Sequence, residues 1–127
     1  MKTNYKVAIA LIAGAAIGGA AIQGLNAQSK PPVYVVGENT VTNVDAYTKE
    51  YVPVVRPAIA KSGGKLLAAS QKVTSLEGAP QTARVTINVF DSLEKAQASR
   101  KVPEYLEARK IGEKYAKFRA YIVEGLP

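Results

Sequence analysis

The chain contains no cysteine and no histidine. Without cysteine, the fold gains no disulfide in an oxidising compartment, and it has no thiol nucleophile, thiolate ligand or sulfur for lipid attachment. Without histidine, it lacks the usual general base at neutral pH, the commonest transition-metal ligand and every Ser-His or Cys-His arrangement. The carboxylates show no metal-binding spacing on any one predicted element. We therefore expect no metal and no cofactor, and a large share of enzyme mechanisms is excluded.

Acidic residues are also few, with 10 Asp and Glu against 17 Lys and Arg in 127 residues. Residues 1–27 hold two of the basic residues and no acidic one, so the remaining 100 residues carry 15 basic and 10 acidic residues, a net charge of +5. The basic residues are interspersed with glutamates, which is typical of a solvated surface rather than of a nucleic-acid groove. We expect no nucleic-acid partner.

An apolar run without charge extends from Val7 to Ile22, preceded by Lys2 and Lys6 and followed by a short polar stretch that ends at Ala27. This order is typical of a bacterial export signal, so we predict a signal peptide over residues 1–27 and a periplasmic protein. The alternative is an uncleaved inner-membrane anchor facing the periplasm, because the run approaches the length that spans a bilayer. A membrane is expected as a partner only in that alternative.

Residues 28–32 contain two prolines and read as a linker, and residues 33–125 have the length of one domain. A first strand is predicted from Val33 to Val41. Asn43 then caps a helix from Val44 towards Ser62, which Pro53 and Pro57 should kink or divide. The sequence Ser62-Gly63-Gly64 is a helix stop.

The second half of the domain alternates strands and helices in the same way. Asp91 and Glu94 resemble a capping box at the start of a helix. Pairs at four-residue spacing, Arg109 with Glu113 and Glu113 with Lys117, should support the last helix. The predicted elements are a strand over Lys65–Leu76 with a bulge near Ser70 and Gln71, a turn at Glu77–Gln81, a strand over Ala83–Phe90, a helix to Lys101, a helix over Pro103–Lys117 and a strand over Phe118–Val123.

This order, β-α-β-β-α-(α)-β, predicts an α+β fold of the ferredoxin-like type, with a four-stranded antiparallel sheet and helices on one face. Apolar residues in one phase of the strands should pack beneath the helices: Val33, Val35, Val85, Ile87, Val89, Phe118, Ala120 and Ile122. The opposite phase is mixed: Tyr34, Val36, Glu38, Arg84, Thr86, Asn88, Phe90, Arg119, Tyr121 and Val123. Such a face favours a sheet-to-sheet homodimer around a semi-polar cavity.

Four stretches are informative when their order and spacing are taken together: YVVGENTVTNVDAYTKEYVPVVRPAIAKSGGKLL, LEG at Leu76–Gly78, FDSLEKAQ at Phe90–Gln97 and PEYLEARKIGEKYAKFRAYIVEG at Pro103–Gly125. Together they resemble the domain-of-unknown-function 1330 family. The resemblance implies a protomer of the dimeric α/β barrel superfamily and no particular reaction. The segment Ala98–Val102 departs from the family pattern, in which an aromatic residue and Asn-Ser often precede P-E-Y.

The residues best suited to work in a cavity are polar or aromatic side chains on the predicted sheet and helices. As catalytic candidates we name Glu38, a carboxylate base if its pKa is raised, and Arg84, which could grip a carboxylate as Arg119 could. The plainer interpretation is ion pairing between neighbouring strands, and for the tyrosines, including Tyr47 and Tyr115, it is packing. The candidate ligand-binding residues are Tyr34, Glu38, Tyr51, Arg56, Arg84, Asn88, Tyr105 and Arg109.

Two classes of function remain open from the sequence. The first is an exported dimeric module that binds a small apolar or aromatic metabolite, or a partner, without catalysis. The second is a cofactor-independent enzyme, an isomerase or a monooxygenase-like protein acting on a small aromatic or lactone-like substrate, with Glu38 as the proton acceptor.

Overall fold

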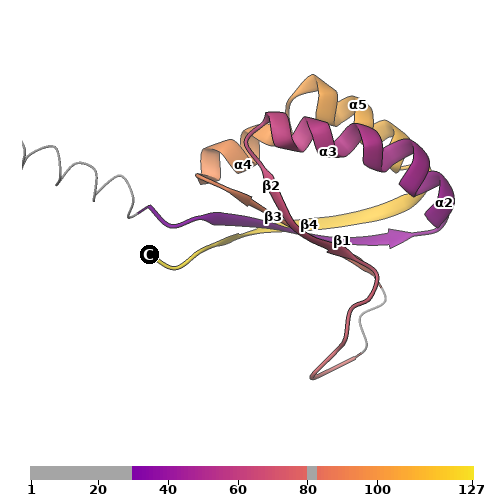
Figure 1. The fold of residues 1–127 in the computed structure, drawn as a ribbon, viewed down its shortest axis with the longest axis horizontal. Helices are drawn as coiled ribbons and strands as arrows, with labels where there is room; N and C mark the ends of the chain where they lie inside the picture. The colour runs from indigo at the N-terminus through magenta and orange to yellow at the C-terminus, as the bar shows by residue number, and fades with distance from the viewer. Residues whose placement is uncertain (1–29, 80–82) are drawn as a thin grey trace, which may run out of the picture. The chain divides into compact units, whose positions relative to one another are not determined.

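In the computed structural model, residues 30–79 and 83–127 are described, and they form a four-stranded antiparallel sheet with helices on one face (Figure 1). The strands lie in the order β2-β3-β1-β4, which is the ferredoxin-like order that the sequence predicts. The elements are β1 (Val33–Val41), α2 (Val44–Ala46), η1 (Tyr47–Tyr51), α3 (Val52–Lys61), β2 (Lys65–Ser70), β3 (Arg84–Phe90), α4 (Leu93–Ser99), α5 (Pro103–Gly112) and β4 (Ala116–Glu124).

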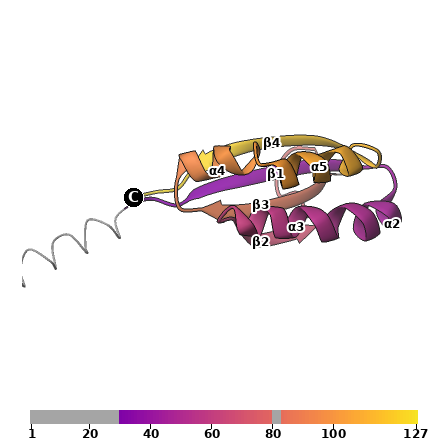
Figure 2. The same ribbon diagram turned by 90° about the horizontal axis from the view of Figure 1, so that it is seen from above.

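The helices cover the sheet in two rows. Seen from above, α3 runs along the half of the sheet that contains β2 and β3, while α4 and α5 run along the half that contains β4 (Figure 2). Buried residues from η1, α3, α5 and the start of β4 make the larger core cluster, which consists of Tyr47, Tyr51, Val55, Ala58, Tyr105, Ala108 and Ala116. A smaller cluster beneath α4 consists of Val33, Val35, Phe90 and Ala96.

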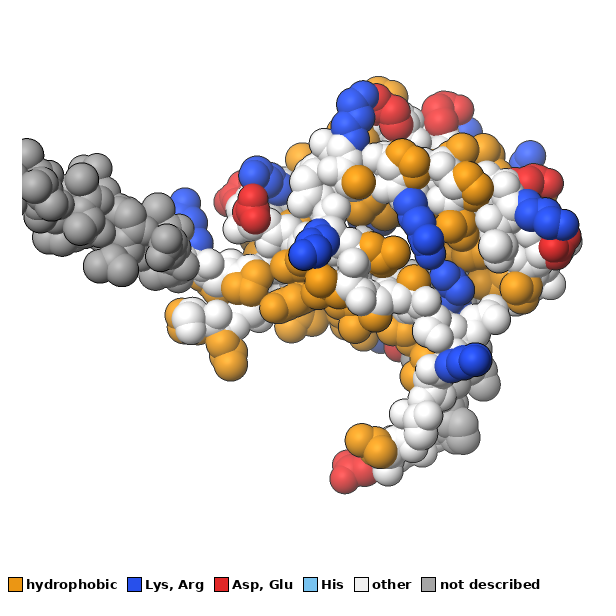
Figure 3. Space-filling model, in the orientation of Figure 1, with side chains coloured by type: hydrophobic (Ala, Val, Ile, Leu, Met, Phe, Trp, Pro, Cys, Tyr) orange, Lys and Arg blue, Asp and Glu red, His pale blue; other side chains and the backbone are white. Residues whose placement is uncertain are grey.

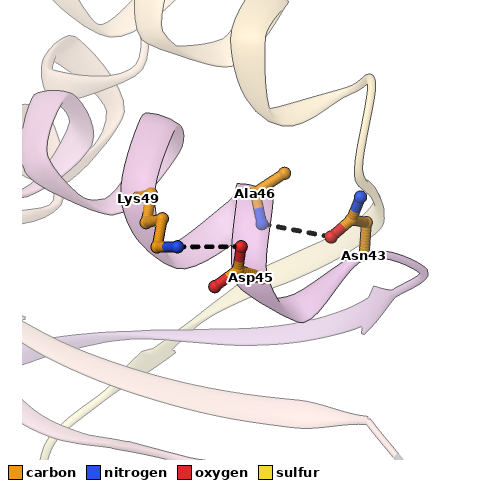
Figure 4. Close-up of polar contacts among 4 residues, drawn as sticks. All are labelled: Asn43, Asp45, Ala46 and Lys49. Atoms are coloured by element: carbon orange, nitrogen blue, oxygen red, sulfur yellow. Dashed lines mark hydrogen bonds and ion pairs between the residues drawn. The ribbon is translucent and has the colours of Figure 1, made fainter.

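Asn43 begins the first helical segment, as the sequence predicts. Its side-chain oxygen accepts a hydrogen bond from the backbone N–H of Ala46 at 3.1 Å, which satisfies one of the free amides of the first turn (Figure 4). Lys49 and Asp45 add an exposed ion pair of 3.0 Å at four-residue spacing. At the other end, the helix stops after Lys61, and Gly63 takes a left-handed φ of 92°.

The interruption of this helix differs in detail from the prediction. It consists of a π-helical turn, η1, that lies immediately before Pro53, while Pro57 lies inside α3 without dividing it. The amide of Val52 donates to the carbonyl of Tyr47, a step of five residues. Because Pro53 has no N–H to donate, the wider turn falls where a regular hydrogen bond could not form. Both Tyr47 and Tyr51 are buried on the side facing the sheet.

Strand β2 is shorter than predicted. It ends at Ser70 instead of Leu76, and its irregularity lies between Leu66 and Ala68 instead of near Gln71. The reason is the partner strand: Ser70 pairs with Val85, and β3 begins only one residue earlier, so residues beyond Ser70 have no strand to bond to. The predicted turn at Glu77–Gln81 lies partly outside the described residues.

The start of α4 also corrects the prediction. Ser92, and not Asp91, is the N-cap, since its hydroxyl accepts from the amide of Lys95 at 3.2 Å. Asp91 instead forms an ion pair of 3.1 Å with the Lys95 ammonium. The helix ends at Ser99, two residues before the predicted Lys101.

Helix α5 begins at Pro103 as predicted but ends at Gly112, well before Lys117. Residues from Ala116 onward are taken up by β4, which pairs with β1 along its whole length. Glu113 therefore follows the helix, and the predicted pairs of Glu113 with Arg109 and with Lys117 are absent from the ion pairs of the described residues.

The register corrects the predicted faces of β3. Val35 pairs with Asn88 and Ile122, so these three share the face beneath the helices. Val36 pairs with Ile87 and Tyr121 on the other face, which we call the open face. The prediction for β3 was wrong by one residue: Arg84, Thr86, Asn88 and Phe90 lie toward the helices, and Val85, Ile87 and Val89 belong to the open face.

The predicted signal peptide, residues 1–27, and the first residues of the predicted linker lie outside the described residues. The linker's last residue, Pro32, accepts a hydrogen bond from the amide of Gly125 at 2.7 Å. No helix in the described part of the chain is long and apolar enough to cross a membrane.

Candidate ligand-binding cavity

A cavity of about 230 Å³ lies between the helices and the sheet. Its floor comes from the helix-facing side of β1, β3, β4 and β2, and its roof comes from η1, α3 and α5. In the space-filling view, Lys and Arg side chains cross the hollow between helices and sheet (Figure 3). The lining residues include Gly37, Asn39, Tyr47, Tyr51, Val52, Val55, Arg56, Ile59, Leu66, Ala69, Arg84, Thr86, Asn88, Arg100, Tyr105, Arg109, Phe118 and Ala120.

The floor owes its space to a glycine on β1. A side chain on Gly37 would place its Cβ 2.5 Å from the Thr86 hydroxyl oxygen, so any larger residue would enter the cavity floor. Next to it, the Asn39 amide nitrogen donates to the Tyr47 hydroxyl at 3.1 Å, which joins the floor to the roof. The floor is therefore partly polar and is fixed in position by a buried hydrogen bond.

Asn88 on β3 is a buried polar residue of the sheet floor. Only 5% of its surface is exposed, and its side chain makes no hydrogen bond to the described residues. A buried primary amide offers two N–H donors and one carbonyl acceptor, and buried polar groups are usually satisfied. The Asn88 amide therefore has hydrogen-bonding capacity left for a molecule in the cavity.

Aromatic rings of the roof and of β4 pack tightly together at one wall of the cavity. The rings of Tyr47 and Tyr51 lie 5.0 Å apart, and the ring of Phe118 meets that of Tyr51 edge-on at 5.4 Å. Gly112 makes this approach possible, because a Cβ there would lie 2.7 Å from the Tyr51 ring and 2.8 Å from the Phe118 ring. The aromatic groups thus form an apolar wall of fixed geometry.

Burial raises the pKa of Tyr51 to about 12, and the neighbouring Tyr105 and Tyr47 act in the same direction. The Arg109 guanidinium lowers this pKa, but by less than burial raises it. The phenol of Tyr51 is therefore protonated at neutral pH and can donate a hydrogen bond.

Four arginines line the cavity, and none of the lining residues is acidic. Arg84, Arg100 and Arg109 are half-buried, whereas Arg56 is exposed. The guanidinium carbons of the three half-buried arginines lie over aromatic rings, with that of Arg109 3.3 Å from the Phe118 centroid. Arg100 also donates to the Tyr105 hydroxyl at 2.5 Å. The ion pairs of the described residues join other groups: Lys49–Asp45, Lys61–Glu104, Lys95–Asp91, Lys110–Glu107 and Arg119–Glu38.

Six of the eight candidate ligand-binding residues come together at this cavity. They are Tyr51, Arg56, Arg84, Asn88, Tyr105 and Arg109. The other two, Tyr34 and Glu38, lie on the open face, and Glu38 forms an ion pair with Arg119 at 2.9 Å. The two proposed catalytic residues, Glu38 and Arg84, are thus on opposite faces of the sheet.

This cavity is distinct from the one that the sequence suggested. The semi-polar space between the open faces of two sheets stays a prediction, whereas the cavity described here lies within one chain, on the helix side. The lining residues not named as candidates include Asn39, Tyr47 and Arg100. Asn39 continues the alternation of Val33 and Val35, and Tyr47 precedes Tyr51 by four residues, so both signals were present in the sequence.

The described residues contain no group of three or more carboxylates that could hold a metal ion. The chemical capacity of the cavity is therefore that of its arginines, amides, phenols and apolar groups. These can bind, orient and hydrogen-bond a small molecule, and guanidinium and phenol groups can stabilise negative charge on it.

Residues 32–126 match the family described as Domain of unknown function (DUF1330). The chain belongs to this family. The match spans every described strand and helix of the DUF1330 domain, and it agrees with the resemblance seen in the sequence. No protein among the curated proteins matches the chain.

Solved structures share the fold of this DUF1330 domain. A protein of unknown function from Rhodopseudomonas palustris, RPA0582, is 21% identical with a TM-score of 0.60, and the match covers 77% of this chain and 85% of that one. SnoaB, a cofactor-independent oxygenase from Streptomyces nogalater, is 12% identical with a TM-score of 0.57, covering 76% and 95%. A nipsnap family protein of unknown function from Agrobacterium tumefaciens is 16% identical with a TM-score of 0.55, covering 76% and 89%. These likenesses show the fold alone, a four-stranded antiparallel sheet with helices on one face.

Proposed function

We propose that this DUF1330 protein is a dimeric module that binds a small apolar or aromatic metabolite in the cavity between its helices and its sheet. The observation that carries the proposal is the cavity itself, about 230 Å³ lined by tyrosines, a phenylalanine and aliphatic side chains with a few convergent polar groups. This composition is typical of small-molecule sites, and the volume is somewhat below the roughly 300–1,000 Å³ of pockets for drug-sized ligands. A molecule of one or two rings would fill it.

Binding, and not turnover, is the role that the lining favours. A cofactor-independent isomerase or oxygenase would need a group that accepts a proton from its substrate. Glu38, the carboxylate suggested for that role, lies on the open face in an ion pair with Arg119. The likeness to the oxygenase SnoaB, at 12% identity, concerns the fold alone.

We propose further that two copies pack their open faces together. The central row of that face is Ile87, Val36 and Tyr121, which are register partners on β3, β1 and β4. Tyr121 and Val123 are 41% and 47% exposed in the single chain. A contiguous apolar sheet face of this kind is typical of an interface, and its own copy is the partner that a two-fold axis supplies.

For the leader, we propose cleavage after Ala27 and release into the periplasm. The intact mass of protein recovered from the cell envelope tests this proposal. A chain that begins at Gln28 supports it, whereas a full-length chain retained in the membrane fraction would favour the anchor.

The binding proposal is tested with 2-naphthoate and 2-naphthamide, two aromatic probes of the same size, by isothermal titration calorimetry on the full-length protein. Ala120→Phe should abolish binding of both, because Ala120 lies opposite Gly37 and a phenyl group there enters the cavity. Ala98→Phe is the matched control, since Ala98 is exposed on α4 and outside the lining. If neither probe binds, or if Ala120→Phe changes nothing, the proposed site is wrong.

A further inference from the structure

The charged residues that line the cavity are all basic. Arg56, Arg84, Arg100 and Arg109 come from four different elements or connections of the fold and meet at one cavity without an acidic residue among the lining. Elsewhere in the described chain, five basic residues pair with carboxylates at 2.7–3.1 Å. Part of the basic charge outside the cavity is thus locally paired, while the charged residues of the cavity lining are all basic.

Unpaired guanidinium groups are costly in a partly enclosed space, because they lose water without gaining a counter-charge. The aromatic rings offset part of this cost: Arg84 lies 5.8 Å from the Tyr47 centroid and Arg100 lies 4.7 Å from that of Tyr105. A ring face, however, takes up none of the in-plane N–H donors, of which each guanidinium has five. Arg100 gives one donor to the Tyr105 hydroxyl and Arg109 hydrogen-bonds to the Tyr51 phenol, which leaves most of the donors for a ligand. The cavity therefore holds preformed donors that an anion would satisfy.

A second, independent observation concerns Asn88. Its side chain is about nine-tenths buried or more, lines the cavity and has no hydrogen-bond partner among the described residues. Buried amides are usually hydrogen-bonded, so this amide in the cavity floor is suited to pair with a polar atom of a ligand. The arginines and this amide converge on the same space from the roof and the floor.

We propose that the ligand of the cavity is a small aromatic carboxylate, whose carboxylate is held by the arginines and whose ring lies against the tyrosines and Phe118. This inference rests on the proposed binding function and adds the charge and class of the ligand. Arginine favours planar, bidentate partners, and a carboxylate presents two oxygens in the matching geometry. The aromatic wall favours a ring over a free inorganic anion.

The test compares 2-naphthoate with its neutral analogue 2-naphthamide on the full-length protein at neutral pH and moderate salt. The expected result is that naphthoate binds at least about tenfold more tightly, which corresponds to about 1.4 kcal/mol. Inorganic phosphate is titrated as a third probe and should compete with naphthoate only weakly.

Variants of the lining arginines test whether the preference for naphthoate arises in the cavity. Arg84→Gln should remove most of the preference for naphthoate over naphthamide, and Arg84→Lys should restore part of it. Arg56→Gln is a second variant with little risk to folding, because Arg56 is exposed at the cavity. Lys114→Gln removes the same charge from an exposed position outside the lining and should leave the preference intact.

The outcomes separate the two proposals. If both probes bind equally and Ala120→Phe abolishes both, the binding function stands and the anionic ligand is wrong. If neither probe binds, both are wrong. If Lys114→Gln reduces the preference as much as Arg84→Gln does, the attraction is a general effect of net charge and the inference is overturned. Phosphate binding as tight as that of naphthoate would overturn the aromatic part.

Discussion

Glu38 on β1 and Arg119 on β4 are register partners across the sheet and form an ion pair of 2.9 Å on the open face. The Glu38 side chain is 18% exposed, whereas that of Arg119 is 76% exposed, so the pair lies at the edge of solvent. Of the two interpretations that the sequence left open for Glu38, cross-strand pairing is the one the geometry bears out. The pair is separated from the cavity by the sheet itself.

Glu38→Gln should therefore leave the affinity for 2-naphthoate unchanged within error. The free energy of unfolding should fall by no more than about 1 kcal/mol, because the pair is largely exposed on the arginine side. Calorimetric titration and urea denaturation measure the two effects. A loss of ligand binding in a folded Glu38→Gln protein would contradict the placement of the site on the helix side.

Ile87→Lys should convert the proposed dimer to a monomer, because it places a charge in the central row of the open face. Light scattering coupled to size-exclusion chromatography gives the molar mass. The matched control is Val54→Lys, since Val54 is 41% exposed on α3 and distant from the open face. Ile87→Lys that keeps the wild-type mass would show that the open face is not the interface.

The high pKa of Tyr51 should make stability depend on pH in the alkaline range. The folded-state pKa is about 12, against 10.0 for a tyrosine in the unfolded chain. Below the lower value both states are protonated, and between the two values only the unfolded chain loses the proton, so stability falls as pH rises. Between about pH 9 and about pH 11, the stability advantage of the wild type over Tyr51→Phe should shrink by about 1 kcal/mol.

Urea denaturation of both proteins at the two pH values measures this difference, and the comparison cancels the contribution of the other titrating groups. A constant difference between wild type and Tyr51→Phe would mean that the Tyr51 phenol is not desolvated in the folded protein.

Gly112→Ala should destabilise the fold by about 1–3 kcal/mol, the usual cost of overpacking. The new Cβ would lie 2.7 Å from the Tyr51 ring and 2.8 Å from the Phe118 ring, and both rings form the cavity wall. Affinity for 2-naphthoate should fall as well. Gly78→Ala is the control. An alanine would be strained there, because φ is 81°, but its Cβ would meet nothing within 4 Å. Binding should therefore be unaffected.

Local features were predictable because they depend on neighbours along the chain. The alternation of Val33 to Val41, the Asn43 cap and the helix stop at Gly63 each follow from residue types a few positions apart. Their order predicted the ferredoxin-like fold. Six of the candidate residues named from the sequence also line the cavity, because polar and aromatic side chains on these elements are few.

Pairing between strands decided what the sequence left undetermined. The sequence predicted that Ile87 and the other apolar residues of β3 face the core. The register with β1 instead turns Asn88 toward the helices. Because side chains alternate with a period of two, a shift of one residue exchanges the two faces completely. The end of β2 at Ser70 was likewise set by where β3 begins, which no local signal in β2 reports.

The sequence by itself thus determined the elements, their order and the family, because propensity, capping and hydrophobic period are local properties. Tertiary structure alone decided that this cavity lies on the helix side of the sheet, that Glu38 faces Arg119, and that four arginines meet without a carboxylate in the lining. Those facts depend on register and on helix placement, which bring together residues distant in the chain.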